Sequence, residues 1–129
     1  MKNSELIEQF YEGIRENNSA KLSACVHAQF ELIWQGSTDI PWSGRWRGVS
    51  GLEEFFSILG THVEVVSISV AHEVSDQDIT IVVLNGQWLV RPNATEISAT
   101  AANIFAFEDE RIRSYTVIND SEAFAKALL

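Results

Sequence analysis

The chain has 129 residues, of which 46% are hydrophobic and 21% charged, and its nine basic and eighteen acidic side chains give a formal net charge of −9. This length and composition are typical of a single folded domain over residues 1–129, and they exclude disordered and fibrous chains. The acidic balance repels nucleic-acid phosphate and anionic lipid, so it argues against nucleic acids and membrane surfaces as partners.

Two helices are predicted at the N-terminus. The first could be capped by Asn3 or Ser4, and its apolar residues recur at three- and four-residue spacing: Leu6, Ile7, Phe10, Tyr11 and Ile14. Residues 17–19 break this pattern, and Ser19 can cap a short second helix. One side of that second helix carries Leu22, Cys25 and Val26.

A short strand over residues 30–34 is predicted next, because this segment is apolar and β-prone. The loop that follows is unusually aromatic, since Trp42 and Trp46 come soon after Trp34. A third helix follows Gly48 with Ser50 as its cap. Its buried face carries Leu52, Phe55, Phe56 and Leu59.

Four runs rich in β-branched residues then predict a meander of antiparallel strands over residues 63–74, 79–90, 95–107 and 112–118. The breaks between the runs are short enough for hairpins. A last helix over residues 121–129 has Asp120 or Ser121 as its cap and an apolar stripe of Ala123, Phe124, Ala127 and Leu128.

This order of elements excludes a doubly wound nucleotide-binding fold, because a meander contains no βαβ crossovers. Strands this long curl, so helices on one side of the sheet can close a hollow. We therefore predict an α+β fold, a curved antiparallel sheet cone with about three N-terminal helices packed on its concave face. A ligand would bind in the hollow.

Three stretches of the chain together resemble the SnoaL-like branch of the ketosteroid isomerase superfamily, whose fold is also called nuclear-transport-factor-like or cystatin-like. They are QFYEGI at residues 9–14, IPWSGRWRG at residues 40–48, and residues 112–128, where a strand is followed by an Ala-rich helix. The resemblance implies one pocket for a small molecule. It also implies a homodimer formed through the sheet.

The resemblance assigns candidate catalytic roles to three residues. Tyr11 matches a tyrosine that donates a hydrogen bond to a substrate oxygen, and Asn103 falls at the place of a second, protonated donor. Asp120 is similar to the carboxylate that acts as base in polyketide-cyclase relatives. Trp34 stands where the steroid isomerases have their general base, which argues against steroid-type isomerisation.

Each of these residues also has a purely structural interpretation. Asp120 sits where a helix cap is needed, and Tyr11 could be a core tyrosine bonded to the backbone. Asn103 lies in an apolar strand and needs a partner in any case, because an unpaired buried amide costs about 1–3 kcal/mol. The aromatic residues could fill a wide sheet or line a ligand pocket. The candidate ligand-binding residues are Trp34, Trp42, Trp46, Phe55, Trp88 and Phe105.

No cofactor is predicted. His27, His62 and His72 lack the paired spacing of a metal site, and the chain has no glycine-rich phosphate loop. The one cysteine, Cys25, cannot form an internal disulfide and lies in an apolar stretch, so we expect an inert thiol. No apolar run approaches the ~20 residues of a membrane span, and no secretory signal is recognisable, so we expect a cytoplasmic protein.

Two functions follow as hypotheses. The first is a pocket that binds a small hydrophobic compound, cyclic and bearing a carbonyl or hydroxyl group, with a cofactor-free isomerase or cyclase as its enzymatic version. The second is a non-catalytic dimeric interaction module whose aromatic residues serve packing alone. A cone filled by side chains would favour the second hypothesis, and a void would favour the first.

Overall fold

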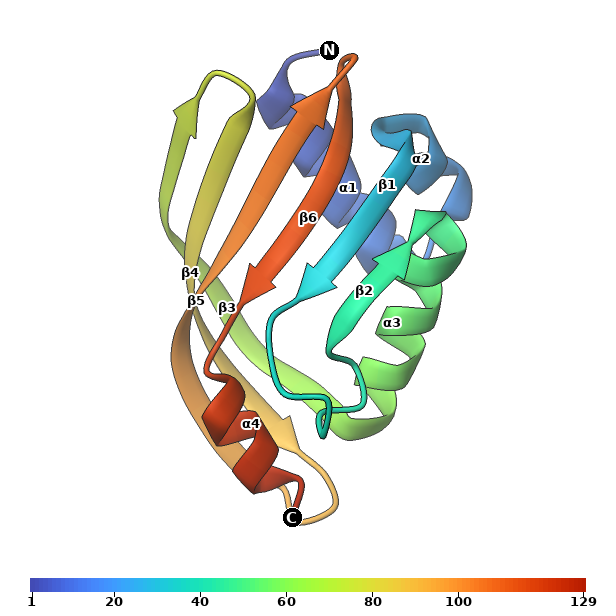
Figure 1. The fold of residues 1–129 in the computed structure, drawn as a ribbon. Helices are drawn as coiled ribbons and strands as arrows, with labels where there is room; N and C mark the ends of the chain where they lie inside the picture. Colours follow the sequence, from blue (N-terminus) through green and yellow to red (C-terminus); the bar gives the residue numbers. More distant parts are fainter.

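The computed structural model describes residues 1–129 as an α+β fold with one curved, unclosed six-stranded sheet and four helices (Figure 1). The strand order is β2-β1-β6-β5-β4-β3. The elements are α1 (Asn3–Glu16), α2 (Ser19–Cys25), β1 (Val26–Trp34), β2 (Gly44–Arg47), α3 (Gly48–His62), β3 (Val63–Asp76), β4 (Ile79–Val90), β5 (Thr95–Glu108), β6 (Arg111–Ile118) and α4 (Ser121–Ala127).

The meander is confirmed, since β3, β4, β5 and β6 pair in sequence as antiparallel neighbours. β1 instead runs parallel to β6, and β2 adds an antiparallel edge strand outside β1. The sequence predicted neither the β2 strand nor the parallel pairing. β2 is only four residues long and mostly exposed, so it lacks the apolar run that marks a strand.

The N-caps of three helices lie one to three residues before the predicted ones. Lys2 is the N-cap of α1, and its backbone N–H donates to the Glu5 carboxylate at 3.3 Å. Asn18, rather than Ser19, caps α2 by accepting from the backbone N–H of Lys21 at 3.1 Å. Arg47 is the N-cap of α3. Asp120 caps α4 as one of the two predicted candidates.

Helices α1, α2 and α3 lie on one side of the sheet, and α4 packs at the end of the strands opposite the N-terminus (Figure 1). Inward-facing side chains of the sheet meet these helices in one hydrophobic core. At its centre the Phe10 ring of α1 packs on Phe30 and Phe105, with ring centroids 5.9 and 5.7 Å away. None of the four helices combines the length and the apolar character needed to cross a membrane.

Strand β3 is the exception to this burial, because nearly all of it is exposed. It forms the edge of the sheet, and its inward residues Val65 and Ile68 are 54% and 51% exposed. The core therefore opens along this strand, and that opening leads to the candidate site.

Candidate functional site

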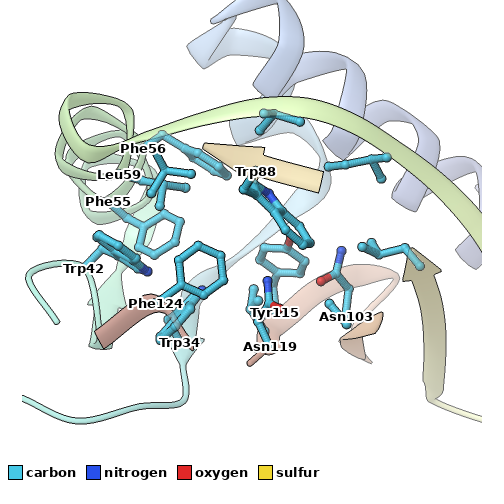
Figure 2. A pocket seen from close by; sticks show the side chains of 16 residues that line it. Trp34, Trp42, Phe55, Phe56, Leu59, Trp88, Asn103, Tyr115, Asn119 and Phe124 are labelled. Carbon is cyan, nitrogen blue, oxygen red and sulfur yellow. The ribbon is translucent and has the colours of Figure 1, made fainter. Parts of the chain in front are cut away.

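A cavity of about 130 Å³ lies between α3, α4 and the concave face of the sheet (Figure 2). Sixteen residues line it, and 14 of them are hydrophobic. They are Trp34, Trp42, Phe55, Phe56, Leu59, Val63, Val65, Ile68, Leu84, Trp88, Ala101, Asn103, Tyr115, Val117, Asn119 and Phe124. The cone is therefore not completely filled by its own side chains.

Aromatic rings form one wall of the cavity. The Phe124 ring of α4 lies edge-to-face against Trp34 and Trp42, with both centroid distances at 5.9 Å, and against Trp88 at 5.8 Å. Edge-to-face pairs place the positive rim of one ring on the negative face of the next and hold the rings in fixed orientations. This wall of the cavity therefore consists of ring edges and faces that pack against one another.

Two asparagines supply the polar groups at the other end (Figure 2). Asn103 of β5 is only 5% exposed, and its Nδ2 donates to the Tyr11 hydroxyl at 2.8 Å. Asn119, which follows β6, accepts at Oδ1 from the backbone N–H of Asp120 at 2.7 Å. Both amides are held in place by the protein, which fixes the direction of their remaining polar atoms.

The two tyrosines near this end are neutral at physiological pH. Burial raises the pKa of Tyr11 above its usual value of 10, although the hydrogen bond from Asn103 acts in the opposite direction. Burial raises the pKa of Tyr115 well above 10. Because no lining residue is acidic, basic or a histidine, the cavity presents only neutral groups to a ligand.

Five of the predicted site residues line the cavity, and the other four do not. The lining contains Trp34, Trp42, Phe55, Trp88 and Asn103. Trp46 packs outside it on Phe55 and donates its indole N–H to the Trp42 carbonyl oxygen at 3.1 Å. Phe105 is fully buried in the core behind the cavity, where it contacts Tyr11.

Tyr11 and Asp120 border the site without lining it. Tyr11 reaches the site through its hydrogen bond with Asn103. Asp120 is exposed, and its carboxylate caps α4 by accepting from the backbone N–H of Ala123 at 3.1 Å. In this structure the carboxylate proposed as a base faces the helix end and solvent.

Sequence reasoning did not assign the other 11 lining residues to the site, among them Tyr115, Asn119 and Phe124. The signal for the first two is the alternation along the last strand. Val117 is paired with Asn103 and faces inward, so its second neighbours on either side, Tyr115 and Asn119, face inward as well. No comparable signal marks Phe124, because a short apolar stripe indicates only that a helix packs somewhere.

One cluster outside the cavity contains side chains that can bind metals. The Nε2 atom of His27 lies 3.2 Å from the Glu108 carboxylate and 3.6 Å from that of Asp109. The Nδ1 atom accepts from the backbone N–H of Gln29 at 3.0 Å, so one of the two ring nitrogens is already bonded within the protein. The cluster lies between β1 and the β5–β6 turn and contributes no residue to the cavity.

The family model of the SnoaL-like domain matches residues 7–115 of the chain. The chain belongs to the SnoaL-like family. The match spans most of the helices and strands that enclose the cavity, so the family explains the scaffold on which this site is built. A comparison with curated proteins found no match.

Solved structures with the same fold cover nearly the whole SnoaL-like chain. An NTF2-like protein from Burkholderia xenovorans LB400 is 20% identical, with a TM-score of 0.84 over 97% of this chain and 94% of its own. TerC, co-crystallized with polyporic acid, is 19% identical, with a TM-score of 0.76 over 98% of this chain and 97% of its own.

A third structure is that of a protein with a ketosteroid isomerase-like fold from Catenulispora acidiphila DSM 44928, in complex with trimethylamine. It is 11% identical, with a TM-score of 0.70 over 91% of this chain and 86% of its own. At these identities the likeness concerns the fold alone.

Proposed function

We propose that the cavity binds a small, neutral, largely apolar compound that contains one ring and bears a carbonyl or hydroxyl group. The observation that carries this proposal is the lining, which is aromatic along one wall, has two fixed amides at one end and contains no charged residue. A charged ligand would lose its hydration without gaining an ionic partner, which makes its transfer unfavourable. The complexes of TerC with polyporic acid and of the Catenulispora protein with trimethylamine support a ligand-binding use of this fold.

The volume limits the size of the ligand. A dry engineered cavity of about 150 Å³ in another protein holds one benzene molecule. The cavity of about 130 Å³ therefore suits a single ring with a small substituent, unless part of a larger ligand extends past Val65 and Ile68 at the open edge. A four-ring steroid does not fit inside it.

Binding is better supported than acid–base catalysis. The enzymatic version of the hypothesis needs a titratable base beside the ligand, and Asp120 was the candidate. Its exposed carboxylate lies outside the lining and is hydrogen-bonded to the end of α4. The lining asparagines cannot titrate, and Tyr115 stays protonated because its pKa is raised.

A cavity-filling variant tests the binding function. Ala101 lines the cavity and is 4% exposed, so Ala101→Leu should occupy the space that a ligand needs. We expect single-ring ketones to shift the indole N–H signals of Trp34, Trp42 and Trp88 in the wild-type protein, and to shift that of Trp46 least. The shifts should disappear in Ala101→Leu.

The matched control is Ala71→Leu, which adds the same side chain at an exposed position of β3. It should bind like the wild-type protein. Equal shifts in Ala101→Leu and Ala71→Leu, or equal shifts of all four tryptophans, would place the ligand outside the cavity.

A homodimer formed through the sheet is the second part of the proposal, and one observation favours it. The outward-facing side chains in the middle of β4, β5 and β6 are all uncharged, although 21% of the chain is charged. They are Ile81, Val83, Asn85, Gln87, Ser98, Thr100, Ala102, Ile104, Ala106, Ser114, Thr116 and Ile118. Depletion of charge is typical of the core of a subunit interface. A second copy of the chain, placed face to face across a two-fold axis, would cover this surface.

A further inference from the structure

The two asparagines of the cavity are each bonded to the protein at one end only. Asn103 uses its Nδ2 on the Tyr11 hydroxyl, so its Oδ1 is left as a hydrogen-bond acceptor. Asn119 uses its Oδ1 on the backbone N–H of Asp120, so its Nδ2 is left as a donor. The cavity therefore borders one acceptor atom, Asn103 Oδ1, and one donor atom, Asn119 Nδ2, that make no hydrogen bond within the protein.

Neither free group has a partner in the protein, and neither is closed off. Trp42 Nε1 is the one buried side-chain nitrogen or oxygen that is both inaccessible and without a hydrogen bond. Asn103 Oδ1 and Asn119 Nδ2 must therefore be accessible, and both residues line the cavity. A polar group in an apolar lining is stabilised when a ligand supplies the missing hydrogen bond.

Both groups lie within reach of one small ring, because they border the same small cavity. Asn103 is paired with Val117 across β5 and β6, and Asn119 comes two residues after Val117, just past the end of β6. Both side chains line the same cavity of about 130 Å³, beside Tyr115. Side chains of this length can both contact adjacent atoms of a single ligand (Figure 2).

We propose that the cavity selects a single-ring ligand that carries a hydrogen-bond donor and an acceptor on neighbouring atoms, as in a cyclic amide or a hydroxy-carbonyl compound. The ligand's N–H or O–H donates to Asn103 Oδ1, and its carbonyl oxygen accepts from Asn119 Nδ2. This inference rests on the proposed binding function and names the ligand class of that site. Tyr115, whose hydroxyl can donate or accept, does not discriminate between ligands.

A matched pair of ligands tests this selection. Cyclohexanone offers an acceptor alone, and δ-valerolactam is a ring of nearly the same size that adds an N–H beside its carbonyl. Because one net hydrogen bond typically contributes about a factor of five in affinity, we expect the wild-type protein to bind the lactam about fivefold more tightly than the ketone. Dissociation constants would come from titrations that follow the indole N–H signals.

Two variants separate the roles of the asparagines. Asn103→Leu should abolish the preference for the lactam while the ketone still binds, because only the lactam donates to Asn103. Asn119→Leu should weaken both ligands by a similar factor and leave their ratio unchanged, because both accept from Asn119.

Tyr11→Phe serves as a second variant if Asn103→Leu does not fold. It removes the group that orients the Asn103 amide, so the lactam preference should fall while the ketone affinity is kept. Ligand binding with a lactam-to-ketone ratio that is the same in the wild-type protein, Asn103→Leu and Tyr11→Phe would overturn this inference but leave the binding function intact. Failure of both ligands to bind the wild-type protein would overturn the binding function itself.

Discussion

At the scale of single residues, the site depends on which atoms of each side chain are already bonded. Asn103 was expected to be a donor to a ligand oxygen, but its Nδ2 donates to Tyr11 and its free oxygen is an acceptor. Asp120 was expected to be either a base or a helix cap, and its carboxylate has the hydrogen bond of a cap. In both cases the neighbouring residue decides the chemistry, and the residue type alone does not.

The cap interpretation of Asp120 leads to a prediction about stability and binding. Asp120→Asn should leave the free energy of unfolding nearly unchanged, because Asn caps helices as well as Asp does. Asp120→Ala should lower it by about 1 kcal/mol through loss of the bond to the Ala123 N–H. Urea denaturation measures both changes, and ligand titration should show wild-type affinity in Asp120→Asn. A clear loss of ligand affinity in Asp120→Asn would show that its charge acts on the site.

At the scale of elements, the sheet has two faces with different tasks. The inward residues of β4, β5 and β6 pack on the helices or line the cavity, and the outward residues are uncharged. β3 belongs neither to the packed inner face nor to the uncharged outer face, since it is exposed and forms the opening of the cavity. This division explains how one sheet could serve a ligand site and a subunit interface at once.

The outward face gives a prediction about assembly. The wild-type chain of 14.4 kDa should sediment as a dimer, and Ile104→Asp should sediment as a monomer because it buries an unpaired charge at the centre of the uncharged face. Ser57→Asp adds the same charge on the exposed side of α3 and should remain dimeric. A monomeric wild-type protein at micromolar concentration, or a dimer that persists in Ile104→Asp, would contradict the proposed interface.

At the scale of the whole molecule, one core holds two buried groups that ionise only at high pH. Cys25 is fully buried, and burial raises the pKa of its thiol from 9.0 to about 11. Burial raises the pKa of Tyr115 well above 10. The neutral thiol agrees with the inert cysteine expected from the sequence. Both groups link the stability of the fold to alkaline pH.

The free energy of unfolding falls at alkaline pH, because the folded chain then binds more protons than the unfolded chain. Above pH 9 the unfolded chain releases the Cys25 proton while the folded chain keeps it until about pH 11, so the unfolded state binds fewer protons. The stabilising effect is fully present below pH 9 and is lost as the pH rises, by at most about 1.4 kcal/mol per pH unit for this group. Cys25→Val should flatten the decline in free energy of unfolding between pH 9 and 10.5. An unchanged slope, measured by urea denaturation at each pH, would rule out this role of the thiol.

The sequence by itself determined most of the scaffold. Hydrophobic periodicity located all four helices and the four strands of the meander, because burial of one helix face or one strand face leaves a local pattern in the chain. It also indicated an aromatic pocket, and Trp34, Trp42, Phe55 and Trp88 do line the cavity. Only the exposed β2 strand, which buries too little to leave such a pattern, was missed.

The tertiary structure decided which polar groups face the cavity. Several of its contacts leave no periodic signal in the sequence, because they join segments that are far apart or orient single atoms. They are the parallel pairing of β1 with β6, the packing of Phe124 from α4, and the hydrogen bonds from Asn103 to Tyr11 and from Asp120 to Asn119. The bond between residues 11 and 103 exists only because α1 lies across the concave face of the sheet. Local patterns record that a residue is buried, whereas hydrogen-bond direction and cavity volume depend on what the fold places opposite it.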